Sequence, residues 1–405
     1  MKVIQGGVTS AAGFTAAGMH CGVKSSNPEK KDVALIYSEK NCTAAGAFTL
    51  NMVKAAPVLY TKEMLRDGHA QAIVANSGNA NACAPRGEVN ARRMAACAAA
   101  ALGLDVKDVA VASTGVIGQT LNIEVIEQGI PVLAKNLSKH GGNDASLAIM
   151  TTDTVQKQAA VEVVLDGKTV TIGGMAKGSG MIHPNMGTML CFITTDAAIS
   201  AEMLRKALLS CVDVSFNRIS VDGDTSTNDS CIVLANGLAG NEEITGEGAD
   251  FTEFCSGLRH VCIRLARMMA ADGEGAKHLI TCLVRRAASE QKAELVGKSI
   301  IRSPLVKTAI FGTDANWGRI LAAAGYSGAE FDPDKCSVAF MSDAGSIKVC
   351  ENGRGLLFDE DMAKKVLFEK EIIIDFDMGE GSAEVTCWGC DLSYDYVRIN
   401  GDYRT

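Results

Sequence analysis

Apolar and polar positions follow two different periods along this chain, which together predict a mixture of strands and helices. Short apolar runs bounded by turn residues predict buried strands at Ala34–Tyr37, Gln71–Ala75 and Val109–Ala112. Longer segments rich in good helix formers predict helices at Gly87–Ala101, Ile123–Leu137, Ala201–Cys211 and Phe251–Ala271. The pattern therefore predicts an α/β or α+β fold, and periodicity alone does not choose between the two.

A hairpin in the middle of the chain has the clearest local signal. Ala159–Leu165 and Lys168–Ile172 alternate apolar and polar residues on either side of Asp166-Gly167. Asp-Gly between two such runs is a strong signal for a type I′ turn. A glycine-rich stretch, Gly173–Gly187, follows the hairpin and leads into a predicted strand at Met189–Ile193.

The last third of the chain, from about Lys277, has its own mixture of predicted elements. Predicted strands in it are Leu279–Val284, Ser337–Phe340, Glu371–Phe376 and Glu384–Trp388. This part of the chain is therefore a candidate for a separate domain.

Composition and charge narrow the possible functions. A chain of 405 residues is long enough for two or three domains. The net charge of −8 argues against a nucleic-acid partner, because phosphate binding needs clustered lysine and arginine. We find no secretory signal and no apolar stretch long enough to span a membrane. The 14 cysteines lie mostly among apolar neighbours, as buried thiols of a cytoplasmic protein do.

The segment Ala176–Leu190 is the most informative about chemistry. Lys177 precedes Gly178-Ser179-Gly180, whereas the lysine of a phosphate-binding P-loop closes the glycine run. An irregular connection between two strands is the simpler interpretation. Chemistry is favoured by Gly187-Thr188 at the edge of an apolar strand, where a strained peptide bond would expose its carbonyl to the threonine hydroxyl. Hydrolysis of the resulting ester would free the threonine α-amine, which can act as the base for its own hydroxyl.

This segment and several others resemble the ornithine acetyltransferase family, also called glutamate N-acetyltransferase. The other matching motifs are Ala75–Ala82, Ser113–Gly118, Met150–Thr154, Asp314–Arg319, Trp388–Asp391 and Asn400–Thr405. They occur in the family's order and span nearly the whole chain, so the resemblance is specific. Two positions depart from the pattern: the family usually has alanine where this chain has Gly187, and often has alanine at Gly401.

The resemblance implies an enzyme of arginine biosynthesis that cuts itself between Gly187 and Thr188. Thr188 would take acetyl from N2-acetylornithine and pass it to glutamate, a ping-pong reaction through acetyl-Thr188. No cofactor is implied, and acetyl-CoA would be a co-substrate only if the enzyme is bifunctional. The family also implies that the two fragments stay together and pair into an α2β2 heterotetramer.

The fold implied by the resemblance is a layered αββα-type sandwich, as in ornithine acetyltransferases and related aminopeptidases, with a smaller C-terminal α+β domain. Residues 1–187 would be the alpha chain after cleavage. Residues 188–276 would complete the catalytic core as the first part of the beta chain, and residues 277–405 would be its C-terminal domain.

Two residues match the family's oxyanion hole: Thr114 with its hydroxyl and Gly115 with its backbone N–H. A donor fixed where charge develops is worth about 3–4 kcal/mol. Without the resemblance, Ser113–Gly115 would be interpreted as a turn that ends the strand Val109–Ala112.

The family's substrate-binding positions match Thr151, Lys177, Thr188, Glu274, Asn400 and Thr405. Lys177 would meet a substrate carboxylate as a point charge, and Glu274 would pair with a substrate ammonium. Taken alone, Lys177 would be a solvated loop charge, and Glu274 would cap the helix end around Ala271–Gly275.

Other interpretations stay open from the residues. Cys387 and Cys390 form a single C-x-x-C, which lacks the second pair of a four-cysteine zinc site, and the six histidines have no metal-ligand spacing. We expect no metal site. An N-terminal-nucleophile aminopeptidase or amidase of the same fold would pass the acyl group to water instead of an amine. A non-enzymatic binding or structural protein would not cut itself.

Overall fold

The long strand β3 (Val33–Phe48) joins the two halves of the larger β-sheet. The computed structural model describes residues 1–25, 27–183 and 189–402. The first part of β3 pairs antiparallel with β2 (Phe14–Met19) and β4 (His69–Asn79), and its last part pairs antiparallel with β10 (Ser230–Ala235). Its register with β4 shifts between Tyr37 and Cys42, a bulge of the kind that bends a strand.

One half of this sheet extends from β10 and the other from β4. Beyond β10 come β8 (Leu190–Thr195), β7 (Lys168–Lys177), β6 (Lys157–Leu165) and β1 (Lys2–Ile4), and beyond β4 comes β5 (Val109–Val116). Strands β8 and β10 run parallel, as do β4 and β5.

The alternation of side chains along the strands divides the interior into three core layers. In β8, Phe192 faces the core between the two halves of the sheet, whereas Cys191 faces the helices α5 (Ala201–Asp213) and α6 (Ala249–Ala271). In β4, Ile73 faces the core between the halves, whereas Val74 faces the other pair of helices.

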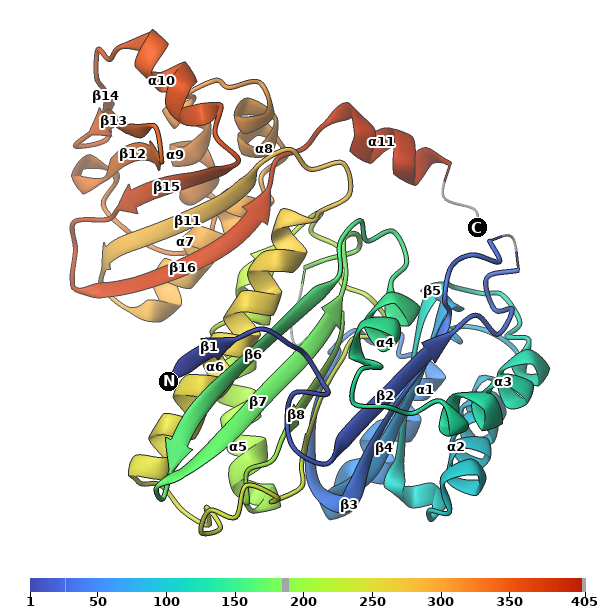
Figure 1. Cartoon of the computed structure of the whole chain (residues 1–405). Helices are drawn as coiled ribbons and strands as arrows, with labels where there is room; N and C mark the ends of the chain where they lie inside the picture. The colour runs from blue at the N-terminus through green and yellow to red at the C-terminus, as the bar shows by residue number, and fades with distance from the viewer. Residues whose placement is uncertain (26, 184–188, 403–405) are drawn as a thin grey trace.

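That other pair consists of α2 (Gly87–Leu102) and α3 (Ile123–Lys135). The layers are therefore helix, sheet, sheet and helix, and the helices cover the two outer faces (Figure 1). The predicted αββα sandwich is confirmed. Periodicity alone did not choose between α/β and α+β, and the packing of helices on both outer faces gives a mixed α/β sandwich.

The predicted hairpin is confirmed as β6 and β7. Asp166 and Gly167 between them have φ values of 47° and 70°, the left-handed angles of a type I′ turn. The second strand of the hairpin is longer than predicted: β7 does not end at Ile172 but continues through Gly173–Lys177 in register with β8. Glycine is needed at 173 for packing: a Cβ there would lie 2.1 Å from the Gly7 carbonyl oxygen.

The chain after α6 forms most of a second sheet, which has its own core. Its order is β14 (Arg354–Gly355), β13 (Gly345–Glu351), β12 (Ser337–Ser342), β15 (Glu371–Asp377), β11 (Leu279–Ala287), β16 (Ala383–Cys390) and β9 (Ile219–Ser220). Helices α7 (Glu290–Arg302), α8 (Pro304–Phe311), α9 (Trp317–Gly325) and α10 (Glu360–Leu367) belong to this part. Because β9 comes from the middle of the chain, this sheet is not made from residues 277–405 alone. The proposed division of the chain at 187 and 276 stays a prediction.

Three further helices remain, one at the end of the chain and two in its first half. The last helix, α11 (Tyr394–Gly401), leaves the second sheet and extends back over the first half of the molecule (Figure 1). Helix α4 (Gly142–Ile149) packs on β2 and contributes Ala145, Ala148 and Ile149 to the core between the halves. Helix α1 (Ala56–Met64) packs on β5. Within the described ranges, no helix is long and apolar enough to cross a membrane.

The contact between β2 and α4 predicts a destabilising substitution. A Cβ added at Gly18 would lie 2.0 Å from the backbone oxygen of Asp144, so Gly18→Ala must push α4 off β2. We expect the free energy of unfolding to fall by about 3 kcal/mol, the upper end for overpacking. Urea denaturation measures it, and Gly246→Ala is the control because nothing lies within 4 Å of its added Cβ. Equal stability of the two variants would contradict this account of the packing.

Candidate active site

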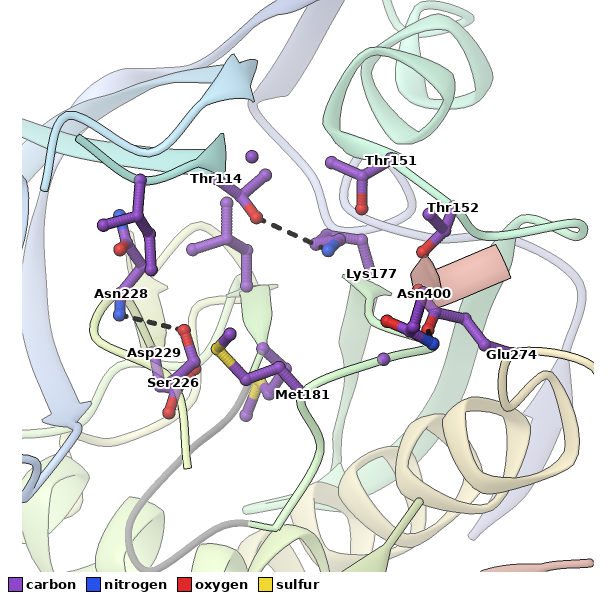
Figure 2. A pocket seen from close by; sticks show the side chains of 15 residues that line it. Thr114, Thr151, Thr152, Lys177, Met181, Ser226, Asn228, Asp229, Glu274 and Asn400 are labelled. Atoms are coloured by element: carbon purple, nitrogen blue, oxygen red, sulfur yellow. Dashed lines mark hydrogen bonds between the residues drawn. The ribbon is translucent and has the colours of Figure 1, made fainter. Parts of the chain in front are cut away.

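One cavity brings together every predicted site residue that the structure describes. Its lining includes Thr114, Gly115, Thr151, Lys177, Glu274 and Asn400. The other lining residues are Ile117, Thr152, Gly180, Met181, Met189, Leu190, Ser226, Asn228 and Asp229. Thr114 and Lys177 lie between Glu274 with Asn400 on one side and Ser226 with Asp229 on the other (Figure 2). Gly187, Thr188 and Thr405 lie outside the described residues.

Thr114 and Gly115 are strand residues, so the interpretation of Ser113–Gly115 as a turn is wrong. Strand β5 continues to Val116, and Gly115 pairs with Gly78 of β4. Gly115 has a φ of 131°, and a Cβ there would lie 2.3 Å from the Gly78 carbonyl carbon. Only glycine fits such a position. The strand therefore presents the Thr114 hydroxyl and the Gly115 backbone to the cavity.

Lys177 is a buried cation at the end of β7, and the interpretation as a solvated loop charge is wrong. It is 7% exposed, and its Nζ donates to Thr114 Oγ1 at 3.4 Å. Because Lys177 satisfies this oxygen as an acceptor, the hydroxyl proton of Thr114 is free to point at another acceptor. Burial lowers the pKa of Lys177, and the charges of Asp153, Glu274 and Asp229 oppose this effect.

Asp153, which does not line the cavity, connects Lys177 to its surroundings. Its Oδ1 accepts from the Lys157 Nζ at 2.7 Å and the Gly178 backbone N–H at 2.6 Å, and its Oδ2 accepts from the Thr151 backbone N–H at 3.0 Å. Lys177 Nζ lies 3.9 Å from the same Oδ2. Burial alone would raise the pKa of Asp153, but the two lysines outweigh it and hold that pKa well below its ordinary value.

Glu274 and Asn400 form a hydrogen-bonded pair from different parts of the chain. Asn400 Nδ2 on α11 donates to Glu274 Oε2 at 2.8 Å, and the Glu274 backbone N–H donates to the Ser179 carbonyl at 2.8 Å. Helix α6 ends at Ala271 with Asp272 at its C-cap, so the interpretation of Glu274 as a helix cap is wrong. Gly180 makes room for the carboxylate, because a Cβ there would lie 2.3 Å from Glu274 Cδ.

Sequence reasoning missed Asp229. Its side chain is 1% exposed, and its Oδ2 has no hydrogen-bond partner among the described residues. Burial raises its pKa well above the ordinary value, against the opposing effects of Ser226, the Met189 backbone, Lys177 and Thr49. An acid directly before the wholly buried strand β10 is the only signal of it in the sequence, and such residues are common at strand starts.

Two sequence features lie outside the cavity. His183 does not line it; its Nδ1 lies 3.2 Å from Ser220 Oγ, and burial together with the charges of Lys298 and Arg302 lowers its pKa to about 4. Cys387 and Cys390 are buried in β16. Across the part of the chain that the structure describes, no cluster of three or more His, Cys, Asp or Glu residues is placed to hold a metal ion.

The fold and the cavity together define the class. Hydroxyl and backbone donors beside a buried cation suit a reaction in which negative charge develops on a carbonyl oxygen, and a carboxylate opposite suits an amine. In an αββα sandwich, such a site beside the start of β8 fits an enzyme that transfers acyl groups.

Comparison with known proteins gives the family. The ArgJ family model matches residues 15–405. The chain is 53% identical over 406 residues to the arginine biosynthesis bifunctional protein ArgJ of Caldanaerobacter subterraneus subsp. tengcongensis, which covers 100% of both chains. It is 53% identical over 396 residues to that of Thermotoga neapolitana, covering 97% of this chain and 99% of the relative.

A solved structure is also similar in sequence. The crystallised arginine biosynthesis bifunctional protein argJ of Bacillus halodurans is 44% identical, with a TM-score of 0.49, over 52% of this chain and 97% of that chain. On the family match and the full-length relatives, this chain belongs to the ArgJ family and is an acyltransferase of arginine biosynthesis. The resemblance found from the sequence is thereby confirmed.

The position of Gly180 predicts a loss of activity. In Gly180→Ala the new Cβ must displace the Glu274 carboxylate from Asn400. We expect acyl transfer to slow by about 10- to 100-fold, as a misplaced site residue typically causes. The matched control is Gly318→Ala, whose Cβ would meet its nearest atom at an ordinary 3.6 Å. Full activity of Gly180→Ala, with Glu274 unmoved in its crystal structure, would contradict the prediction.

Proposed function

We propose that this enzyme transfers acetyl from N2-acetyl-L-ornithine to L-glutamate through an acetyl-Thr188 intermediate. The observation that carries the proposal is the convergence in one cavity of Thr114, Gly115, Thr151, Lys177, Glu274 and Asn400, which come from five separate chain segments. Met189, the residue bonded to Thr188, lines the same cavity. Membership of a family of arginine biosynthesis enzymes supports the substrates.

The reaction has two balanced halves. The Thr188 α-amine takes the proton of its own hydroxyl while Oγ forms a bond to the acetyl carbonyl carbon. The Thr114 hydroxyl and the Gly115 N–H stabilise the resulting oxyanion. When this intermediate collapses, the C–N bond of acetylornithine breaks and the departing amine takes the proton. The glutamate amine then attacks the carbonyl carbon of acetyl-Thr188 and loses a proton to the α-amine. The ester C–O bond breaks, the α-amine returns the proton to Thr188 Oγ, and N-acetylglutamate leaves.

The remaining lining residues would hold the amino-acid parts of the substrates. Lys177 carries the only side-chain positive charge in the described cavity lining, so it is the natural partner of the substrate α-carboxylate. Glu274, oriented by Asn400, is placed to pair with an ammonium group. Thr151 adds a hydroxyl, and we assign Thr405 to the same set by its match to the family motif.

The nucleophile would be made by self-cleavage between Gly187 and Thr188. Backbone hydrogen bonds anchor the described residues on both sides of this bond. Val221 N–H donates to the Ile182 carbonyl at 2.7 Å, and Ser230 N–H donates to the Met189 carbonyl at 2.9 Å. Gly187 stands where the family usually has alanine, and because glycine is less restricted in its backbone angles, we expect it to affect the rate of cleavage more than its outcome.

Further parts of the proposal follow from the family. The transfer reaction needs no cofactor, and acetyl-CoA would serve as co-substrate in a second activity, as the word bifunctional in the relatives' names suggests. The two fragments would remain together and pair into an α2β2 heterotetramer in the cytoplasm.

Mass spectrometry under denaturing conditions tests the cleavage. We expect two fragments, 1–187 and 188–405, because the hydroxyl at 188 breaks the preceding bond. Thr188→Ala should give one full-length chain without acetyl transfer. Thr188→Ser, the matched control, keeps a hydroxyl and should still be cut. Uncut chain in a fully active preparation would refute self-cleavage.

Incubation with N-acetylornithine separates the transferase from an amidase of the same fold. We expect sustained ornithine release to depend on glutamate, and N-acetylglutamate to accumulate with it, because the acetyl-enzyme transfers its acetyl group to an amine. Release of free acetate at a rate that ignores glutamate would favour transfer to water instead. Parallel incubation of the Thr188→Ala variant corrects for background hydrolysis.

A further inference from the structure

We propose that Lys157, which does not line the cavity, is a positioning residue: by holding one oxygen of Asp153, it determines how strongly Asp153 holds Lys177. This inference rests on the proposed role of Lys177 as the partner of the substrate carboxylate. No motif in the sequence singled out Lys157, and the mechanism above does not use it.

The geometry shows one carboxylate shared by two lysines. Lys157 Nζ contacts Asp153 at 2.7 Å, whereas Lys177 Nζ lies 3.9 Å away from Asp153. Lys157 also donates to Asp272 Oδ2 at 2.5 Å, and Asp272 in turn accepts from the Thr154 backbone N–H and hydroxyl. Asp153 therefore gives its close ion pair to Lys157 and only a loose one to Lys177.

Burial makes this sharing consequential. The side chains of Lys157 and Asp153 are both 0% exposed, and that of Asp272 is 6% exposed. Charges so deeply buried persist only when they are paired. The two lysines and two aspartates balance in charge, so a change in one pair must redistribute the others. The same cluster also fixes the backbone N–H groups of Thr151, which lines the cavity, and of Gly178, which follows Lys177.

The loose pairing leaves Lys177 available for substrate. A lysine tightly paired with Asp153 would offer fewer donors to an incoming carboxylate and would hold its own charge more firmly. Because Lys157 occupies Asp153, Lys177 keeps donors free and carries a pKa lowered by burial and by the Lys157 charge. Substrate carboxylate binding then needs the protonated form, so binding weakens as pH rises through the pKa of Lys177.

Other charged groups also face Lys177 and are common to all the variants below. Glu274 faces it from the segment after α6, and Asp229 from the segment before β10. Lys24 reaches the same region from the N-terminal segment and adds a positive charge, while its Nζ donates to the carbonyls of Lys31 and Met150.

The titration of Lys177 can be measured directly in the cleaved enzyme labelled with [ε-13C]lysine, with Lys177→Met to assign its signal. The double variant Lys157→Met/Asp272→Asn removes one buried charge of each sign. Asp153 can then pair with Lys177 without competition from Lys157. We expect the pKa of Lys177 to rise by about one unit, as for a group that gains a close opposite charge. Asp272→Asn alone leaves Asp153 as the remaining acidic partner of Lys157. Asp153 should then pair more closely with Lys157, which should lower the pKa of Lys177.

Binding of L-ornithine, which does not react without an acetyl donor, gives the functional readout. Calorimetry from pH 6 to pH 10 should place the alkaline loss of affinity about one unit higher in the double variant and lower in Asp272→Asn. Lys307→Met is the matched control, because Lys307 is also buried but bonds the Cys390 carbonyl in the second sheet. It should leave the pKa of Lys177 unchanged.

The outcomes separate the two ideas. An unchanged pKa of Lys177 in both Asp272→Asn and the folded double variant would overturn the role of Lys157. If the double variant does not fold, the direction of the shift in Asp272→Asn decides alone. A pKa that shifts while ornithine binding keeps its pH profile would instead refute Lys177 as the carboxylate partner and leave the positioning role of Lys157 intact.

Discussion

A charge buried in protein needs an opposite charge, and the site of this enzyme is organised around one such group, Asp153. Its carboxylate ties together the segment after α4, the entry to β6, the end of β7 and, through Lys157, the end of α6. Moving any of these elements would leave a buried charge unpaired, which costs several kcal/mol. The cluster therefore holds the segments that carry Thr151 and Lys177 in place while it leaves the Lys177 cation only loosely paired.

The sheet supplies the other constraint. Because β3 pairs with strands of both halves, the ends of β5 and β7 and the start of β8 reach the same edge of the sandwich. Donors on β5 and the cation on β7 thus face the residue that follows the proposed nucleophile. The pair of Glu274 and Asn400 closes the opposite side, with α11 returning from the second sheet. An acyl-transfer site results from segments that are far apart in the chain.

Local signals predicted much of the fold, and the errors have a common physical origin. The Asp166-Gly167 turn and the helices over Ile123–Lys135 and Ala201–Asp213 were predictable because φ preference and apolar period act over a few residues. The predicted strand Lys168–Ile172 continues to Lys177, because the glycine at 173 serves close packing against Gly7. From its neighbours in the chain alone, Lys177 was likewise interpreted as a solvated charge, because its buried partner Asp153 lies in another part of the fold.

By itself, the sequence determined the family, the residues that match its motifs and the mixture of strands and helices, because these depend on residue identity and on short periods. The layering of the two sheet halves, the sharing of Asp153 by two lysines and the buried acid Asp229 were decided only by the tertiary structure. Burial and pairing of charge depend on which segments meet in space, and for such groups the surroundings, not the neighbours in the chain, set the energy.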